Sequence, residues 1–246
     1  MAVKVTFVGA GDAFGSGGRF QTCIMVDSPG FRFVIDFGAS SLVALNKLGI
    51  DHNTIDAIVF THIHGDHCGG IPFLLMDAML AAKRARPLII AGPRDTKVRI
   101  AGVCEALLPG MRVMRPKFLL EYVEMEVMKS HEIGPLLVTP YPAVHTEETN
   151  PTSLRIEVAG KVVSYSGDSA WNENIPKVSR GADLFVCECY FYEKPVRHHM
   201  NYPDIREHRS EFGAKRMVLT HFSREMVRHQ ESIPEECAYD GMEINL

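Results

Sequence analysis

Residues 62–67 constrain the fold of this chain more than any other segment, because they read HIHGDH and follow directly on the apolar run at 55–61. Side chains two residues apart in an extended chain lie on one face, so His62 and His64 point to the same side while Asp66 and His67 point elsewhere. One short segment therefore offers ligands to two ions, and dinuclear hydrolytic sites hold their ions roughly 3.5–4 Å apart. We interpret the segment as a metal site rather than as a solvated, histidine-rich turn.

The composition is that of a globular protein that does not enter the membrane. The 246 residues are 46% hydrophobic and 23% charged, and no stretch approaches the roughly 20 apolar residues of a membrane span. No repeat, low-complexity tract or linker divides the chain, which predicts a single domain over residues 1–246. Residues 1–9 read as a strand and lack the apolar stretch and cleavage site of a signal peptide, which predicts a cytoplasmic location.

The six cysteines show no C-x-x-C spacing and are expected to be reduced thiols. Cys187 and Cys189 form the one close pair, and their spacing suits alternate positions on a buried strand better than structural zinc.

The net charge of -4 gives no general attraction to nucleic acid, which disfavours a long polyanion as partner. One local cluster is basic, and two interpretations stay open: a patch that serves a nearby site, or an ordinary solvated surface. Its members are Lys194, Arg197, His198, His199, Arg206, His208 and Arg209.

Short apolar runs predict strands in both halves of the chain, at 3–9, 22–27, 31–36 and 56–61 and then at 136–141, 153–158, 161–165, 184–189 and 216–220. Turn residues at 28–30 and 159–160 predict two hairpins. Helical patterns predict helices at 71–85, 94–108, 202–212 and 223–231, the last with Ser223 as N-cap. Strands in each half with helices after them predict an α/β fold of two sheets packed face to face and covered by helices.

Three further candidate ligands, His145, Asp168 and His221, each follow an apolar run. Strand ends are where a rigid scaffold presents functional groups, so these three side chains are expected to complete the metal site. Each would be a weak indication by itself, and the HIHGDH segment gives them their weight.

In these residues the chain resembles the metallo-β-lactamase superfamily, whose metal-binding motifs match along nearly the whole sequence. The resemblance implies a four-layer αββα metallo-β-lactamase sandwich with two divalent metal ions. It assigns one ion to His62, His64 and His145, the other to Asp66, His67 and His221, and a bridging role to Asp168. An Asp at the bridging position resembles the hydrolases with a shared carboxylate rather than the true β-lactamases. Zinc is the default ion for imidazole and carboxylate ligands, and Mn²⁺ or Fe can also occupy such sites.

Two local matches resemble the ribonuclease Z and cyclic-phosphodiesterase branch. Residues 184–189, LFVCEC, resemble a ribonuclease Z strand that ends with a Glu, and residues 199–201, HMN, resemble its downstream catalytic His loop. The resemblance implies that His199, in preference to His198, contacts the phosphate or acts as general acid and is oriented by Glu188. An imidazole with a carboxylate partner is suited to protonating a leaving alkoxide near neutral pH.

The chain also departs from that branch. Only residues 146–167 separate His145 from Asp168, too few for the long tRNA-gripping arm that many bacterial ribonuclease Z proteins insert there. This departure disfavours tRNA and favours a smaller substrate. The glycine-rich loop at 9–19 lacks the helix of a nucleotide-phosphate fingerprint, so we interpret it as a substrate-side turn in which Arg19 meets an anion or the glycines are purely structural.

The resulting hypothesis is a cytoplasmic dinuclear metallohydrolase that cleaves a small phosphodiester or nucleotide-type substrate with a metal-bridging hydroxide. Asp66 would bind metal and orient the hydroxide, and His199 would assist the leaving group. The alternatives are a lactone, carboxylic-ester or aryl-sulfate hydrolase on the same metals, and a non-catalytic metal-binding family member. The expected partner is a small ester, with neither tRNA nor a membrane, and the resemblance allows a homodimer.

Overall fold

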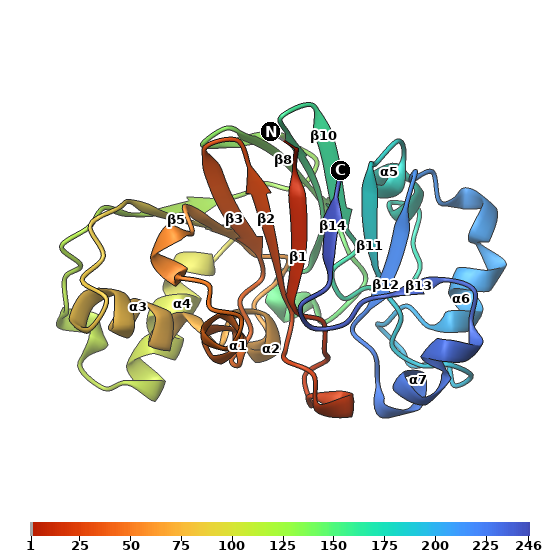
Figure 1. Cartoon of the computed structure of the whole chain (residues 1–246), viewed down its shortest axis with the longest axis horizontal. Coiled ribbons are helices and arrows are strands. Elements are labelled where there is room, and N and C mark those ends of the chain that lie inside the picture. The colour runs from red at the N-terminus through yellow and green to blue at the C-terminus, as the bar shows by residue number, and fades with distance from the viewer. Residues whose placement is uncertain (1) are drawn as a thin grey trace.

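The computed structural model describes residues 2–246, and its framework is a pair of seven-stranded mixed sheets. The sheets face each other across a central core, and helices cover the outside of each (Figure 1). This is the predicted four-layer αββα sandwich. The first sheet runs in the order β14 (Glu243–Asn245), β1 (Lys4–Gly9), β2 (Cys23–Ser28), β3 (Phe31–Ile35), β4 (Ala57–Val59), β5 (Leu88–Gly92) and β6 (Leu120–Glu124). The second runs in the order β13 (Glu236–Cys237), β12 (Met217–Thr220), β11 (Leu184–Glu188), β10 (Lys161–Tyr165), β9 (Thr152–Val158), β8 (Leu136–Pro142) and β7 (His131–Ile133).

The helices divide between the two sheets according to the apolar clusters that they join (Figure 1). Those on the first sheet are α1 (Ser41–Lys47), α2 (Gly65–Cys68), α3 (Ile71–Leu80) and α4 (Thr96–Leu107). Those on the second are α5 (Ile175–Ser179), α6 (Tyr202–Glu207) and α7 (Arg224–His229).

Because both faces of the sheets are covered, strand residues alternate between two apolar environments. On β1, Phe7 lies in the central core and Val8 lies in the outer cluster under the helices. Cys187 and Cys189 both join the outer cluster of the second sheet, as predicted for alternate strand positions, and all six cysteines are free. Glu188 lies between them on β11, so its side chain takes the opposite direction.

Both predicted hairpins form, but the helices differ from prediction at their ends. The helix predicted at 71–85 stops at Leu80, because the chain turns at Lys83, where φ is +48°. The helix predicted at 94–108 begins at Thr96, because Asp95 adopts φ +70°. The 202–212 prediction is wrong beyond Glu207, where α6 gives way to a 3₁₀ turn at Arg209–Glu211.

Ser223 caps α7 as predicted, since its Oγ accepts from the Met226 amide at 3.3 Å.

The turn after α3 is closed by the buried guanidinium of Arg84. It donates to backbone carbonyls of the neighbouring segments at Ile55 (2.6 Å), Pro87 (2.5 Å), Arg86 (2.8 Å) and Asn53 (3.2 Å). One side chain thereby supplies partners to carbonyls that no helix or strand satisfies.

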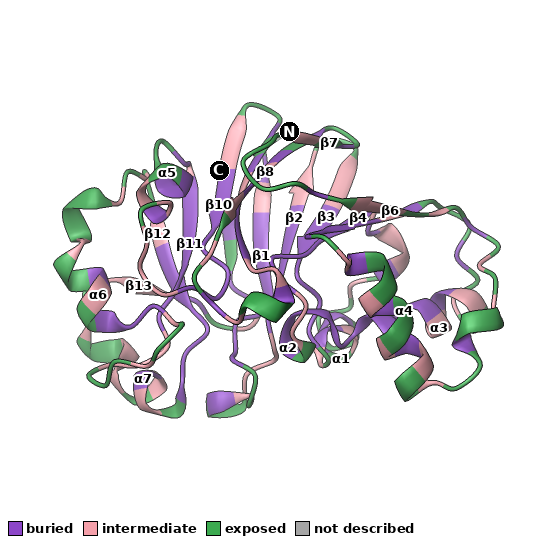
Figure 2. Ribbon diagram, turned by 180° about the vertical axis from the view of Figure 1, so that it is seen from behind, coloured by how far each residue is buried: buried purple, intermediate pink, exposed green. Residues whose placement is uncertain are grey.

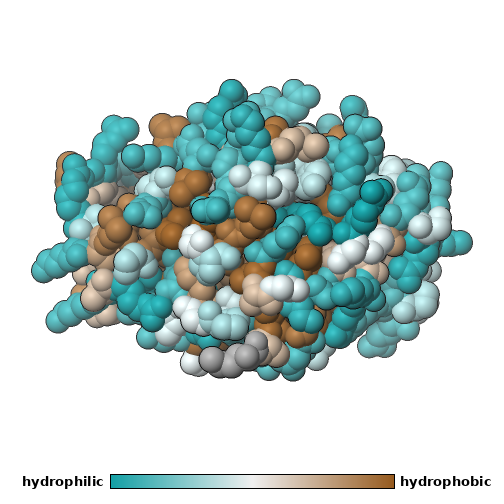
Figure 3. Space-filling model, turned by 90° about the horizontal axis from the view of Figure 1, so that it is seen from above, coloured by the Kyte–Doolittle hydropathy of each residue, from teal (hydrophilic) through white to brown (hydrophobic). Residues whose placement is uncertain are grey.

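Buried residues concentrate in the strands, and exposed residues lie on helices and loops (Figure 2). Seen from above, the surface is mostly hydrophilic, with apolar atoms in a band across its middle (Figure 3). No helix within residues 2–246 has the length and apolar character to cross a membrane.

Candidate metal centre

The predicted ligands meet where strands end. The HIHGDH segment follows β4, while His145, Asp168 and His221 follow β8, β10 and β12. His64, Asp66 and these three line a cavity of about 350 Å³. The remaining two, His62 and His67, are fully buried behind it.

Three imidazole nitrogens converge in the first ligand group. Nδ1 of His64 lies 3.0 Å from Nε2 of His62 and 3.1 Å from Nε2 of His145. With zinc–nitrogen bonds of about 2.0–2.1 Å, the edge of a ligand tetrahedron measures about 3.3 Å, so the nitrogens lie near the separation that one zinc ion needs. Burial lowers the pKa of all three imidazoles, which favours the neutral form that binds metal.

The second ligand group combines two imidazoles with two carboxylates. Nε2 of His67 lies 3.3 Å from Oδ2 of Asp66 and 3.3 Å from Oδ1 of Asp168. Nε2 of His221 lies 3.3 Å and 3.5 Å from the same two oxygens. Two of these buried atoms, Nε2 of His67 and Oδ1 of Asp168, have no hydrogen-bond partner among the described residues. Buried polar atoms without partners are costly, so this group fits a bound cation.

Asp168 faces both groups. Its Oδ1 belongs to the second group, and its Oδ2 lies 4.0 Å from Nε2 of His145 in the first. The donor set thus fits two ions that share one carboxylate, the arrangement implied by the resemblance to the metallo-β-lactamase superfamily.

The carboxylates of the second group favour protons on its imidazoles. Burial disfavours a charged His221, but Asp168 and Asp66 outweigh it and raise the pKa of His221 to about 9. Burial likewise disfavours a charged His67, but the carboxylates of Asp168 and Asp66 outweigh burial. The pKa of His67 is therefore raised. A cation that enters the group must displace these protons, so metal binding and proton release are linked.

Asp36 is a candidate site residue that no sequence motif marks. Fully buried, it accepts from Nδ1 of His67 at 2.7 Å, which leaves the Nε2 of that ring for the ligand group. It also accepts from the amide and the hydroxyl of Thr61, both at 2.8 Å, and that hydroxyl in turn accepts from Nδ1 of His62 at 3.0 Å. The signal was its position directly after the apolar run of β3, the placement that identified the other candidates.

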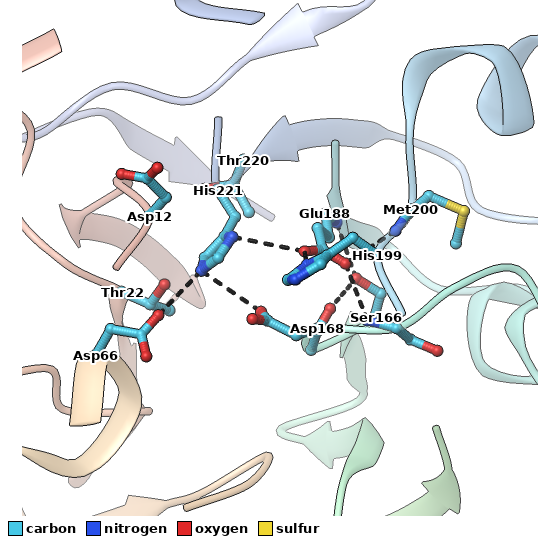
Figure 4. A network of polar contacts seen from close by, with 12 residues as sticks. Asp12, Thr22, Asp66, Ser166, Asp168, Glu188, His199, Met200, Thr220 and His221 are labelled. Carbon is cyan, nitrogen blue, oxygen red and sulfur yellow. Dashed lines mark hydrogen bonds and ion pairs between the residues drawn. The ribbon is translucent and has the colours of Figure 1, made fainter. Parts of the chain in front are cut away.

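Glu188 and His199 form the predicted pair beside the ligand groups (Figure 4). Oε1 of Glu188 accepts from Nδ1 of His199 at 2.5 Å, and Oε2 accepts from the amides of Ser169 and Met200 at 2.9 Å and 3.1 Å. Burial opposes the charged imidazole, but the Glu188 carboxylate outweighs it and raises the pKa of His199. His199 can therefore donate a proton from its remaining nitrogen, Nε2.

His198 occupies a different position from its neighbour. Its side chain is exposed and does not line the metal cavity, whereas His199 does. Its backbone carbonyl accepts from Nδ1 of His145 at 2.8 Å, so His198 orients a candidate ligand through the main chain.

Phe14 and Tyr190 line both the metal cavity and an adjoining pocket of about 570 Å³. The Tyr190 ring stacks on His199 with centroids 4.5 Å apart. Arg224 and Arg228 also line the outer pocket, and no sequence motif marked either of them. Of the predicted basic cluster, only His199 lines one of these two cavities.

Arg19 does not line the metal cavity. It donates to the Gln230 side chain, and its guanidinium lies 5.0 Å from the centre of the Phe222 ring. A Cβ at Gly9 would lie 2.0 Å from the carbonyl oxygen of Gln21, so this glycine is required by close backbone contact. These contacts favour the structural interpretation of the glycine-rich loop.

The chain is similar to known proteins both in sequence and in structure. The model of the family described as anti-Pycsar protein Apyc1 matches residues 3–236. Ribonuclease Z from Lachnoclostridium phytofermentans is 24% identical over 272 residues, covering 89% of this chain and 86% of the relative. Anti-Pycsar protein Apyc1 from Bacillus phage 010DV004 is 24% identical over 235 residues, covering 91% and 90%. The metallo-β-lactamase fold protein YhfI from Bacillus subtilis aligns with a TM-score of 0.79 at 21% identity, covering 99% of both chains, which shows the shared fold.

Proposed function

The chain belongs to the anti-Pycsar protein Apyc1 family, and from this premise we propose that it is a dinuclear metal-dependent phosphodiesterase acting on a small phosphodiester or nucleotide-type substrate. The similarity to a ribonuclease Z supports metal-dependent hydrolysis. The observation that carries the proposal is Asp168 facing two ligand groups beside the Glu188–His199 pair.

In the proposed mechanism, His62, His64 and His145 would hold one divalent ion, Asp66, His67 and His221 would hold the other, and Asp168 faces both groups. Zinc is the proposed ion, with Mn²⁺ or Fe as alternatives. Bound there, two such ions would lower the pKa of a water molecule and stabilise charge on a phosphoryl group.

Residues of the chain supply the remaining steps. Asp66 would orient the attacking water, which loses a proton to solvent as its oxygen forms the new bond to phosphorus. His199 donates the proton of Nε2 to the leaving oxygen as the old P–O bond breaks, and Glu188 stabilises the charged ring before that transfer. Tyr190, stacked on the His199 ring, limits its rotation.

The size of the cavities supports a small substrate. The metal cavity and the outer pocket share Phe14 and Tyr190 and have volumes of about 350 and 570 Å³, within the range of small-molecule sites. The segment between His145 and Asp168 consists of a short turn and the β9–β10 hairpin, which accounts for its length without an arm. We therefore propose that neither tRNA nor a membrane is a partner. A homodimer stays a prediction.

The test is metal content measured together with hydrolysis of bis(p-nitrophenyl) phosphate for wild type, Asp66→Ala and His199→Ala. We expect two metal equivalents and activity in the wild type, and loss of metal and activity in Asp66→Ala. His199→Ala should retain metal, lose little activity on this activated ester, and lose roughly 10²–10⁴-fold on an alkyl phosphodiester, whose leaving group needs a proton. His198→Ala is the matched control and is expected to keep near-normal activity, because only its backbone contacts a ligand.

Lactone, carboxylic-ester and aryl-sulfate substrates are assayed in parallel. Two bound metals with turnover only on one of these would contradict the phosphodiesterase proposal and keep the metal site. Two bound metals with no turnover on any ester would favour a non-catalytic member of the family.

A further inference from the structure

A second cavity system lies away from the metal centre, between α3, α4 and residues 108–122. Figure 1 shows this region at the opposite end of the molecule from α6. It consists of two adjoining cavities of about 610 and 400 Å³, which share Met79, Met114, Arg115 and Phe118 and thus form one groove. Each has the volume of a small-molecule site.

The floor of the groove is apolar. Leu75 and Met79 contribute from successive turns of α3, Cys104 contributes from α4, and Met111 and Phe118 contribute from the segment that follows. Methionine side chains are unbranched and adapt to irregular apolar ligands. Such a floor suits a flexible hydrocarbon chain.

The rim of the groove is basic, although the whole chain has a net charge of -4. No Asp or Glu lines either cavity, and none of the rim cations has a carboxylate oxygen within 4.0 Å in residues 2–246. The rim cations are Lys83, Lys97, Arg112, Arg115 and Lys117. Arg84 also lines the smaller cavity, but its guanidinium is buried against backbone carbonyls.

Two neighbouring carboxylates are engaged by the backbone instead. Glu105 accepts from the amides of Gly110 and Arg112 at 3.1 Å and 2.9 Å, and Glu124 accepts from the amide of Lys97 at 3.2 Å. The exposed side chains of the rim therefore keep their positive charge available to a ligand.

We propose that this groove binds an anionic amphiphile, a molecule with one apolar chain and one carboxylate or phosphate head group. The chain covers the apolar floor, and the head group contacts the exposed cations Arg112, Arg115 and Lys117. A second copy of the chain on this face is disfavoured, because a symmetric contact would set one basic rim against another. An acidic peptide without a long apolar group would leave the floor uncovered.

The experiment is a fluorescence titration of the full chain with dansyl-labelled undecanoate, below the concentration at which the probe aggregates. The methyl ester of the same probe is titrated in parallel and is expected to bind about tenfold more weakly, because it lacks the head-group charge. A triple variant, Arg112→Gln with Arg115→Gln and Lys117→Gln, is expected to weaken binding of the carboxylate by about tenfold.

A second variant changes the shape of the groove without changing its charge. Ala101, exposed on α4, lines the groove, and Ala101→Phe places a ring in the space that the chain of the probe would occupy. We expect it to weaken binding of both probes. Arg206→Gln removes an exposed cation on α6 and is expected to change neither titration.

Several results would overturn the proposal. Equal binding of the carboxylate and its ester would show that the rim cations do not contribute to binding. Binding that survives both groove variants but is lost in Asp168→Ala would locate the probe in the metal cavity. Binding only to vesicles of anionic phospholipid, and not to the monomeric probe, would assign the basic rim to a membrane surface.

Discussion

Nδ1 of His67 donates to Oδ2 of Asp36 at 2.7 Å, while Nε2 of the same ring lies 3.3 Å from Oδ1 of Asp168. One imidazole therefore connects a buried carboxylate outside the ligand set with the carboxylate that faces both ligand groups. Outer partners of this kind fix the tautomer and orientation of a metal-binding histidine.

We predict that Asp36→Asn weakens metal binding by about 10–100-fold while leaving every proposed ligand in place. The amide has nearly the shape of the carboxylate but does not stabilise an N–H donor through charge. Metal retention during dialysis against a chelator measures the effect. Asp27→Asn, which alters a partly exposed ion pair with Arg32, is the control. Equal metal retention in Asp36→Asn and wild type would contradict the role of Asp36.

Removing the shared carboxylate should affect both ions. We predict that Asp168→Ala lowers the content of both metals, because its two oxygens face different ligand groups. His64→Ala should deplete mainly the ion of the first group. Inductively coupled plasma mass spectrometry of the two purified variants separates these cases. Full occupancy of both ligand groups by metal, with normal turnover, in Asp168→Ala would contradict the assignment of Asp168 as a shared ligand.

Metal binding should release protons. Metal binding requires the unprotonated ring of His221, whose pKa is raised to about 9. Below that pH the proton must leave, so the apparent metal affinity should rise with pH up to about 9. Calorimetric titration of the apoprotein in buffers of different ionisation enthalpy counts the protons. A heat that does not depend on the buffer at pH 7 would refute this linkage.

The pH dependence of turnover should depend on Glu188. Because Glu188 raises the pKa of His199, the acid form persists to higher pH, and activity that needs this acid falls as pH rises through that pKa. Glu188→Gln removes the carboxylate and lowers the pKa, so the alkaline limb should move to lower pH. The kcat profile is measured on an alkyl phosphodiester, whose leaving group needs a proton. A uniform loss of rate with an unmoved limb would indicate only a structural role.

Arg84 should contribute to stability rather than to chemistry. Arg84→Met removes the donors that satisfy buried carbonyls, including that of Ile55, and should destabilise the fold by about 2–4 kcal/mol. Arg84→Lys should recover little, since an ammonium group cannot reproduce the planar fork of donors. Urea unfolding monitored by circular dichroism provides the comparison. Arg86→Met is the matched control at an exposed side chain.

The sandwich and most of the proposed site could be predicted from the sequence because the signals are local. A histidine or aspartate at or shortly after the end of an apolar run, as at His221 and His145, marks the end of a strand and a candidate ligand together. Asp36 carries the same local signal, but its function depends on contact with a ring 31 residues away, which no local pattern encodes.

The elements that were missed have weaker signals. β5 is five residues long and lies between two predicted helices, the first of which was extended too far toward it. β6 and β7 are edge strands in which few residues are buried, so they lack a clear apolar pattern. The predicted ends of helices are wrong where single residues adopt positive φ, as at Asp95. The type of side chain alone does not specify positive φ.

The hydrogen bond from His145 to the carbonyl of His198 connects the first ligand group to the loop of His199. Because His145 is a proposed ligand and the loop carries the proposed proton donor, displacing either one would break this hydrogen bond. Under the proposed function, movement of this loop would disturb a metal ligand and the proton donor together. Metal binding and protonation of the leaving group would then be lost together rather than one at a time.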